Sequence, residues 1–83
     1  MKSVFIYTFG TAQLKDFDVQ PTETLLLVDG STEGWARKKV QETKGIGLNF
    51  CTSYPLDRLP DLITKWGNPK LLTLFELNKK RIR

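Results

Sequence analysis

Residues 22–45 have the sequence TETLLLVDGSTEGWARKKVQETKG, in which an apolar run, a glycine-rich turn and a basic segment follow one another. Residues 24–28 are apolar almost throughout, which is typical of a strand covered on both faces. The turn DGSTEG then supplies Ser31 or Thr32 as a helix cap. A helix follows and is predicted to end near Lys44, beside a glycine. The stretch therefore predicts a strand, a turn and a helix in succession.

Three other segments are predicted to be strands, because they are short, apolar and rich in β-branched or aromatic residues. Between the first two predicted strands, a short helix from Thr11 and a strand over residues 14–19 remain open alternatives. The three segments are residues 3–9 (SVFIYTF), 46–51 (IGLNFC) and 71–77 (LLTLFEL).

A second helix is predicted over residues 57–66, where apolar residues recur with the spacing of a core-facing helix. Asp57 is the predicted N-cap, and the sequence Gly-Asn-Pro after Trp66 ends the helix. The apolar stripe consists of Leu59, Leu62, Ile63 and Trp66.

The order of these elements predicts the fold, because strand–helix–strand units make neighbouring strands parallel through right-handed crossovers. We expect a small two-layer α/β domain with a four-stranded, mostly parallel sheet and two main helices. A ferredoxin-like arrangement is the alternative, but its βαββαβ order fits this chain poorly. Residues 1–77 form the predicted domain, and residues 78–83 form a basic tail.

The composition excludes several classes of site. The 83 residues contain no histidine, so the commonest general base and the commonest metal ligand are both missing. A single cysteine, Cys51, cannot form an intramolecular disulfide. A solvated loop is favoured over a Mg²⁺ site for Asp16, Asp18 and Glu23. We expect a cytoplasmic chain with no cofactor, no metal and no membrane partner.

The positive charge is unevenly distributed along the chain. The net charge is +4, and residues 1–77 carry nine basic and nine acidic side chains, so the excess lies in residues 78–83. We expect this tail to be mobile and to contact an anionic partner such as nucleic acid phosphates. The cations of the tail are Lys79, Lys80, Arg81 and Arg83.

A second basic segment begins at Trp35 and continues through Arg37, Lys38 and Lys39. An exposed tryptophan among cations would suit single-stranded nucleic acid or a protein partner. Packing of Trp35 against the sheet is the favoured alternative. If the three cations face the same way as the tail, the nucleic-acid hypothesis gains support.

A candidate anion site follows from the predicted parallel sheet, because ligands bind beyond the carboxyl ends of parallel strands. Helix N-termini pointing into the same crevice would favour an anion. Helix capping alone is the favoured interpretation of these residues. The candidates are Gly30, Ser31, Thr32, Thr52 and Ser53.

Cys51 follows a predicted strand and precedes a helix, so a reactive thiolate and a buried structural cysteine are both considered. The structural role is favoured. A small phosphate- or nucleotide-handling enzyme would use Cys51 with Ser31, Thr32 and Arg58.

These observations favour a small non-catalytic binding protein of the accessory or inhibitor type. We expect it to dock on nucleic acid or on a protein complex that handles nucleic acid. The alternatives are the small enzyme described above and a protein–protein module that uses an edge strand, either residues 3–9 or residues 14–19. A homodimer formed by the same edge is compatible with this hypothesis.

Overall fold

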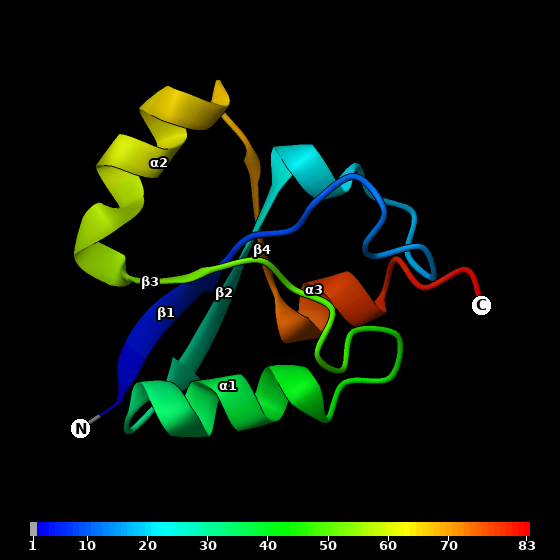
Figure 1. Ribbon diagram of the computed structural model, residues 1–83, viewed down its shortest axis with the longest axis horizontal. Coiled ribbons are helices and arrows are strands. Elements are labelled where there is room, and N and C mark those ends of the chain that lie inside the picture. The colour runs from blue at the N-terminus through cyan, green and yellow to red at the C-terminus, as the bar shows by residue number, and fades with distance from the viewer. Residues whose placement is uncertain (1) are drawn as a thin grey trace.

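The computed structural model describes residues 2–83 and shows a small α/β domain (Figure 1). Short 3₁₀ turns at Pro21–Glu23 and Leu56–Arg58 precede β2 and α2. The strands and helices are β1 (Ser3–Tyr7), β2 (Thr24–Gly30), α1 (Glu33–Gln41), β3 (Ser53–Pro55), α2 (Leu59–Trp66), β4 (Lys70–Thr73) and α3 (Leu74–Asn78).

Over residues 2–83 the sheet has four strands in the order β3-β1-β2-β4, and it is mixed. β1 runs antiparallel to both β2 and β3, and within the described chain β2 and β4 form the only parallel pair. The prediction of a mostly parallel sheet is therefore wrong. The physical reason is the connection over residues 8–23, which contains no crossover helix, so β2 returns alongside β1 in the opposite direction.

The predicted strand at 46–51 is also wrong, because residues 46–48 form turns and residues 49–51 have no regular secondary structure. Gly45 and Gly47 have φ angles of +94° and +57°, which lie in the left-handed region that glycine adopts without strain. The chain becomes extended only at β3, which pairs with β1 through Tyr54 opposite Ile6.

The predicted strand at 71–77 divides into β4 and α3. The division falls at Thr73, whose side-chain oxygen accepts a hydrogen bond from the Glu76 N–H at 3.2 Å. The Glu76 carboxylate in turn accepts one from the Thr73 N–H at 3.0 Å. This reciprocal pair is a capping box, and it starts a helix within an apolar run that resembles a strand.

Both predicted main helices are present, with shifted boundaries. Thr32 caps α1, since its hydroxyl oxygen accepts from the Trp35 N–H at 3.3 Å. Asp57 lies in the 3₁₀ turn that precedes α2, so it is not the N-cap of that helix. α2 ends at Gly67 in the left-handed conformation, as the sequence predicts.

The core lies on both faces of the sheet. It consists of two clusters, one on each face, because successive side chains of a strand point to opposite faces. Tyr7 and Leu26 belong to one cluster, and Ile6 and Leu25 belong to the other. The first face is covered by α1 and α3, through Ala36, Val40 and Leu77, and the second by α2, through Leu62 and Trp66. Helices therefore cover two faces, and the expected two-layer arrangement is wrong.

The C-terminal segment is attached to the loop that follows β1. The Asp18 N–H donates to the Lys80 carbonyl at 2.7 Å, and the Ile82 N–H donates to the Asp16 carbonyl at 2.9 Å. Between these bonds Phe17 pairs with Arg81 in an isolated bridge. The segment 14–19 is thus neither a helix nor a regular strand, and the expectation of a free tail is wrong.

Candidate macromolecular interface

The DGSTEG turn is a capping turn that brings α1 close to the sheet. A Cβ atom on Gly30 would lie only 2.7 Å from the backbone nitrogen of Ala36, so this position leaves no room for a side chain. Thr32 caps the helix, and Glu33 places a carboxylate in its first turn. The capping hypothesis is confirmed, and the anion that this helix end attracts is its own Glu33.

The residues of the candidate anion site do not all lie together, because Gly30 and Thr52 are at opposite ends of β1, whereas Ser53 contacts Arg37 of α1. Gly30 pairs with Ser3 at the start of β1, whereas Thr52 bonds to Thr8 beyond its end. Five residues of strand separate these points by roughly 17 Å. The Thr52 N–H donates to the Thr8 hydroxyl, and Ser53 accepts from Arg37 at 3.2 Å, so both candidates already have protein partners.

A polar network fastens the first turn of α1 to β1 and β3. The buried Tyr7 hydroxyl donates to Glu33 Oε2 at 2.7 Å, and Arg37 Nε donates to Glu33 Oε1 at 3.2 Å. The Arg37 guanidinium also lies 5.1 Å from the centre of the Phe50 ring. Arg37 is therefore occupied within the protein and is not a free surface cation.

Burial and the neighbouring Glu33 carboxylate raise the pKa of Tyr7 above its ordinary value. Burial also acts to raise the pKa of Glu33, but the hydrogen bonds from Tyr7 and Arg37 outweigh it. The pKa of Glu33 consequently lies below its ordinary value. At neutral pH the network thus consists of a neutral phenol, a carboxylate and a guanidinium, which is a structural arrangement.

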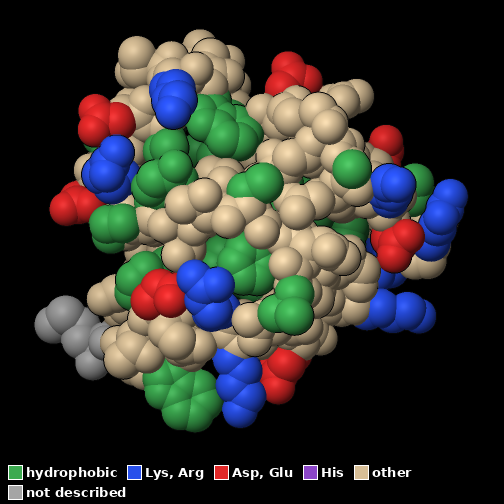
Figure 2. All heavy atoms as spheres, viewed as in Figure 1, with side chains coloured by type: hydrophobic (Ala, Val, Ile, Leu, Met, Phe, Trp, Pro, Cys, Tyr) green, Lys and Arg blue, Asp and Glu red, His purple; other side chains and the backbone are tan. Residues whose placement is uncertain are grey.

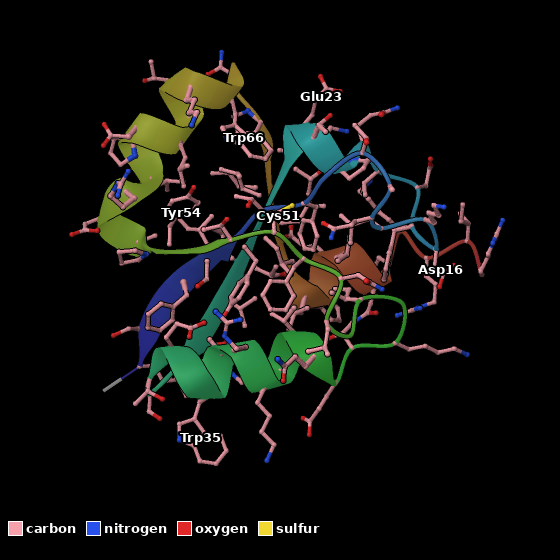
Figure 3. All side chains as sticks on the ribbon, viewed as in Figure 1. Asp16, Glu23, Trp35, Cys51, Tyr54 and Trp66 are labelled. Carbon is pink, nitrogen blue, oxygen red and sulfur yellow. The ribbon has the colours of Figure 1, made fainter. Side chains whose placement is uncertain are left out.

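Trp35 lies on the solvent side of α1, and the favoured interpretation that it packs against the sheet is wrong. Its exposed fraction is 56%, and Lys38 Nζ lies 5.2 Å from its ring centre. Lys39 Nζ is 3.0 Å from an Asp29 carboxylate oxygen. Figure 3 shows Trp35 pointing away from the sheet at the lower edge of the view, whereas Asp16 lies at the right-hand edge. The condition that all three cations of this segment face the same way as the tail is not met, because Arg37 and Lys39 are engaged with Glu33 and Asp29.

A cationic end forms where the C-terminal segment meets two loops. Arg81 Nη2 donates to the Lys44 carbonyl at 2.8 Å, and its guanidinium stacks 4.7 Å from the Phe17 ring centre. Figure 2 shows Lys and Arg side chains gathered at the edge where Figure 1 places the C-terminus, with acidic groups among them. Within residues 2–83 no ion pair involves the other cations of this end, Lys15, Lys44, Lys79, Lys80 and Arg83.

An apolar groove of about 370 Å³, which we call the β4 groove, opens where β2 and β4 end. The groove opens on the same sheet face as α2, because Leu27 lines the groove and shares that face with Leu25. Helix α2 therefore covers this face only in part. Phe75 is 69% exposed at its rim, and Leu71 on β4 is 38% exposed beside it. The lining residues are Val4, Leu27, Val28, Asp29, Thr73, Leu74 and Phe75.

The sequence analysis missed this groove because it placed residues 71–77 in a buried strand. The capping signal Thr73-x-x-Glu76 lies within that run and marks a helix start. A helix that begins there places Phe75 two residues after the cap. Phe75 is therefore exposed to solvent beside the end of β4.

Cys51 is exposed, so the expectation of a buried cysteine is wrong. Its Sγ donates a weak hydrogen bond to Gln13 Oε1 at 3.5 Å. Arg58 instead lies against the Tyr54 ring and pairs with Asp61 at 3.7 Å. Of the four residues of the enzyme hypothesis, Thr32, Cys51 and Arg58 are thus engaged in separate local contacts, and Ser31 is exposed.

Two general features of residues 2–83 complete the description. The His, Cys, Asp and Glu side chains of this range form no group of three or more that could hold a metal ion. None of its helices has both the length and the apolar character that crossing a bilayer requires.

Comparison with protein-family models, curated proteins and solved structures finds no match to this chain.

Proposed function

We propose that this chain is a small non-catalytic binding protein that docks on another protein through the β4 groove. The observation that carries the proposal is the exposed Phe75 at the rim of an apolar groove beside a sheet edge. Exposed aromatic side chains next to a pocket are typical anchors of protein interfaces. Covering such a side chain contributes about 1.5–3 kcal/mol to binding.

The sheet edge supports the same proposal. In the described sheet β4 is an outermost strand, so no strand pairs with the backbone groups along its outer side. The opposite edge is β3, which is three residues long and ends at Pro55, a poor acceptor for a further strand. The edge strands predicted from the sequence were different, because β1 is internal and residues 14–19 form no regular strand.

Two matched variants test this proposal. Phe75→Glu places a charge on the groove, whereas Leu48→Glu makes the same change at an exposed side chain that does not line it. Both proteins and the wild type are used to capture partners from source cells. A captured protein is then purified and its binding is measured directly. We expect the wild type and Leu48→Glu to bind it and Phe75→Glu to fail; equal binding by all three would refute the proposal.

Nucleic acid binding at the cationic end is a second candidate function, favoured by the unpaired cations that the C-terminal segment brings together there. Three cations at this end, Lys79, Lys80 and Arg83, can be changed without disturbing the hydrogen bonds of Arg81. Phosphates that bind these side chains would release counterions, so binding would weaken steeply with salt.

The test compares two triple variants with equal loss of charge, titrated with single- and double-stranded DNA at several salt concentrations. K79Q/K80Q/R83Q alters the cationic end, and K38Q/K65Q/K70Q alters exposed lysines elsewhere. We expect the log–log salt slope to fall only in the first variant, by about 0.9 for each phosphate that the protein no longer neutralises. Equal slopes in both variants, or no binding by the wild type at low salt, would exclude this function.

A further inference from the structure

The β4 groove is apolar inside and cationic around its rim. Asp29 lines the groove, but Lys39 and Lys2 approach its carboxylate at 3.0 Å and 3.6 Å, so two lysines face one carboxylate. On the other side Lys79 Nζ lies 4.5 Å from the Phe75 ring centre.

The acidic side chains near the groove are already engaged. The Asp29 pKa lies below its ordinary value, chiefly because of the hydrogen bond from Lys39, so the group is ionised and paired. Glu76 accepts the Thr73 N–H in the capping box. Three lysines at the rim, Lys2, Lys39 and Lys79, therefore face two carboxylates, a surplus of one positive charge that favours an acidic partner.

The shape of the site favours an extended partner. Leu71 and Thr73 lie opposite Leu25 and Leu27 in the parallel register, so their side chains share the face on which the groove opens. A segment lying along the outer side of β4 would satisfy its backbone groups and point every second side chain toward the groove. A helix in the groove would leave those backbone groups without a strand partner.

We infer that the occupant of the β4 groove is an extended, acidic segment of a partner protein, which adds to the sheet beside β4. This inference rests on the proposed function and specifies the chemistry of its partner. Alternate apolar side chains of the segment enter the groove beside Phe75. Aspartate or glutamate residues between them meet the lysines of the rim.

A second copy of the chain is a less suitable occupant. The net charge is +4, and the excess lies in residues 79–83, which directly follow α3 in the sequence. Two copies that each carry this net positive charge repel one another, whereas an acidic segment is attracted to the same surface.

The test is a selection of short peptides from a randomised display library against the full-length chain, followed by synthesis of the enriched sequences. We expect these peptides to alternate apolar and acidic residues and to shift the amide signals of residues 70–75. Methylating single peptide nitrogens should weaken binding at every second position and leave the others nearly unchanged. An effect of about two- to tenfold is expected for each ladder hydrogen bond that methylation removes.

Charge variants complete the experiment. K2Q/K79Q should weaken the acidic peptides several-fold, while K38Q/K65Q, with the same loss of charge, should not. Phe75→Glu should abolish binding of the selected peptides. Sedimentation of the free chain is expected to show a monomer.

The outcomes separate this inference from the proposed function. Peptides that bind the groove but are basic, neutral or helical, or that tolerate methylation at every position, overturn the acidic extended partner and leave the docking groove intact. A dimer that Phe75→Glu dissociates identifies a second copy as the occupant and likewise overturns the inference. Selected peptides that are unaffected by Phe75→Glu, or no enrichment at all, refute both.

Discussion

The molecule contains two strand-to-helix junctions with the same kind of cap and opposite results. At the first, β2 leads into α1 through a turn that contains Gly30 and the cap Thr32. At the second, β4 leads into α3 with no turn, because Thr73 is both the last strand residue and the cap. Both caps are threonine side chains that accept a backbone N–H.

The difference between the junctions lies in how the helix is directed onto the sheet. After the first, Gly30 lets the helix backbone approach closely, and α1 buries Ala36 and Val40 completely. After the second, α3 buries Leu77 but leaves Phe75 in solvent. One junction therefore builds core and the other builds surface, although a local cap starts the helix in both.

The largest expected effect comes from filling the space at the first junction. Gly30→Val would drive Cβ to 2.7 Å from the Ala36 nitrogen, so α1 must move away from β2. We expect the free energy of unfolding to fall by about 3 kcal/mol, measured by urea denaturation. The matched control is Gly34→Ala, whose added Cβ meets only the Thr32 hydroxyl at 3.7 Å.

Because Gly34 lies inside α1, its replacement by alanine should raise the stability by about 0.5–1 kcal/mol. A Gly30→Val protein as stable as the wild type would show that the close approach of α1 is not required.

The network of Glu33 gives a pH-dependent way to weaken the same junction. Glu33→Gln removes the charged acceptor of Tyr7 and Arg37. We expect a loss of about 1.5 kcal/mol at neutral pH, after discounting for a side chain that is 37% exposed. Urea midpoints of both proteins give the difference.

The sign of the pH dependence follows from the lowered pKa of Glu33. Its stabilising contribution is complete above the ordinary value of 4.5 and is lost as the pH falls through the lower, folded-state value. The wild-type advantage over Glu33→Gln should therefore be constant from about pH 7 to pH 5 and shrink toward pH 3. An advantage that grows on acidification would contradict this assignment.

The two caps can be compared directly by removing each threonine hydroxyl. Thr73→Ala removes the hydrogen bond to the Glu76 N–H and the reciprocal geometry of the capping box. We expect it to cost about 1 kcal/mol. Thr32→Ala removes a single, longer bond of 3.3 Å and should cost less. Serine at either position keeps the hydroxyl and is the control; a larger loss of stability at Thr32 than at Thr73 would reverse the comparison.

The first junction was largely predictable from the sequence because its signals are local. The apolar run, the cap and the helix end all lie within residues 22–45. The same helical spacing also held the signal for an outward Trp35, which the sequence analysis passed over in favour of packing: Ala36 and Val40 define the inward stripe, and Trp35 lies one residue off it. The capping box at Thr73 was equally visible, but the apolar residues around it indicated a strand.

The direction of β1 and the place of the C-terminal segment were not predictable in this way. Both depend on the loop over residues 8–23, which has no regular periodicity and whose course is fixed by distant partners. Phe17, for example, pairs with Arg81, and Gly45 lies against Asp16 and Phe17. The cationic end exists only because of these long-range interactions, whereas the β4 groove depends on the local cap at Thr73 that the apolar run concealed, so the candidate sites were predicted only in part.

The smallest effect on stability is expected from a substitution of Phe75. Comparison with a core substitution in the same helix shows whether Phe75 belongs to the surface. Because its side chain is 69% exposed, Phe75→Glu should change the free energy of unfolding by less than about 0.5 kcal/mol. Phe75 also stacks under Lys79, an exposed interaction that a new Glu–Lys attraction would replace. Urea denaturation of this variant beside Leu77→Ala gives the contrast, because Leu77 is fully buried and its truncation should cost about 2–5 kcal/mol. If Phe75→Glu destabilised the chain as strongly as Leu77→Ala, Phe75 would belong to the core, and the groove could not serve as a free docking surface.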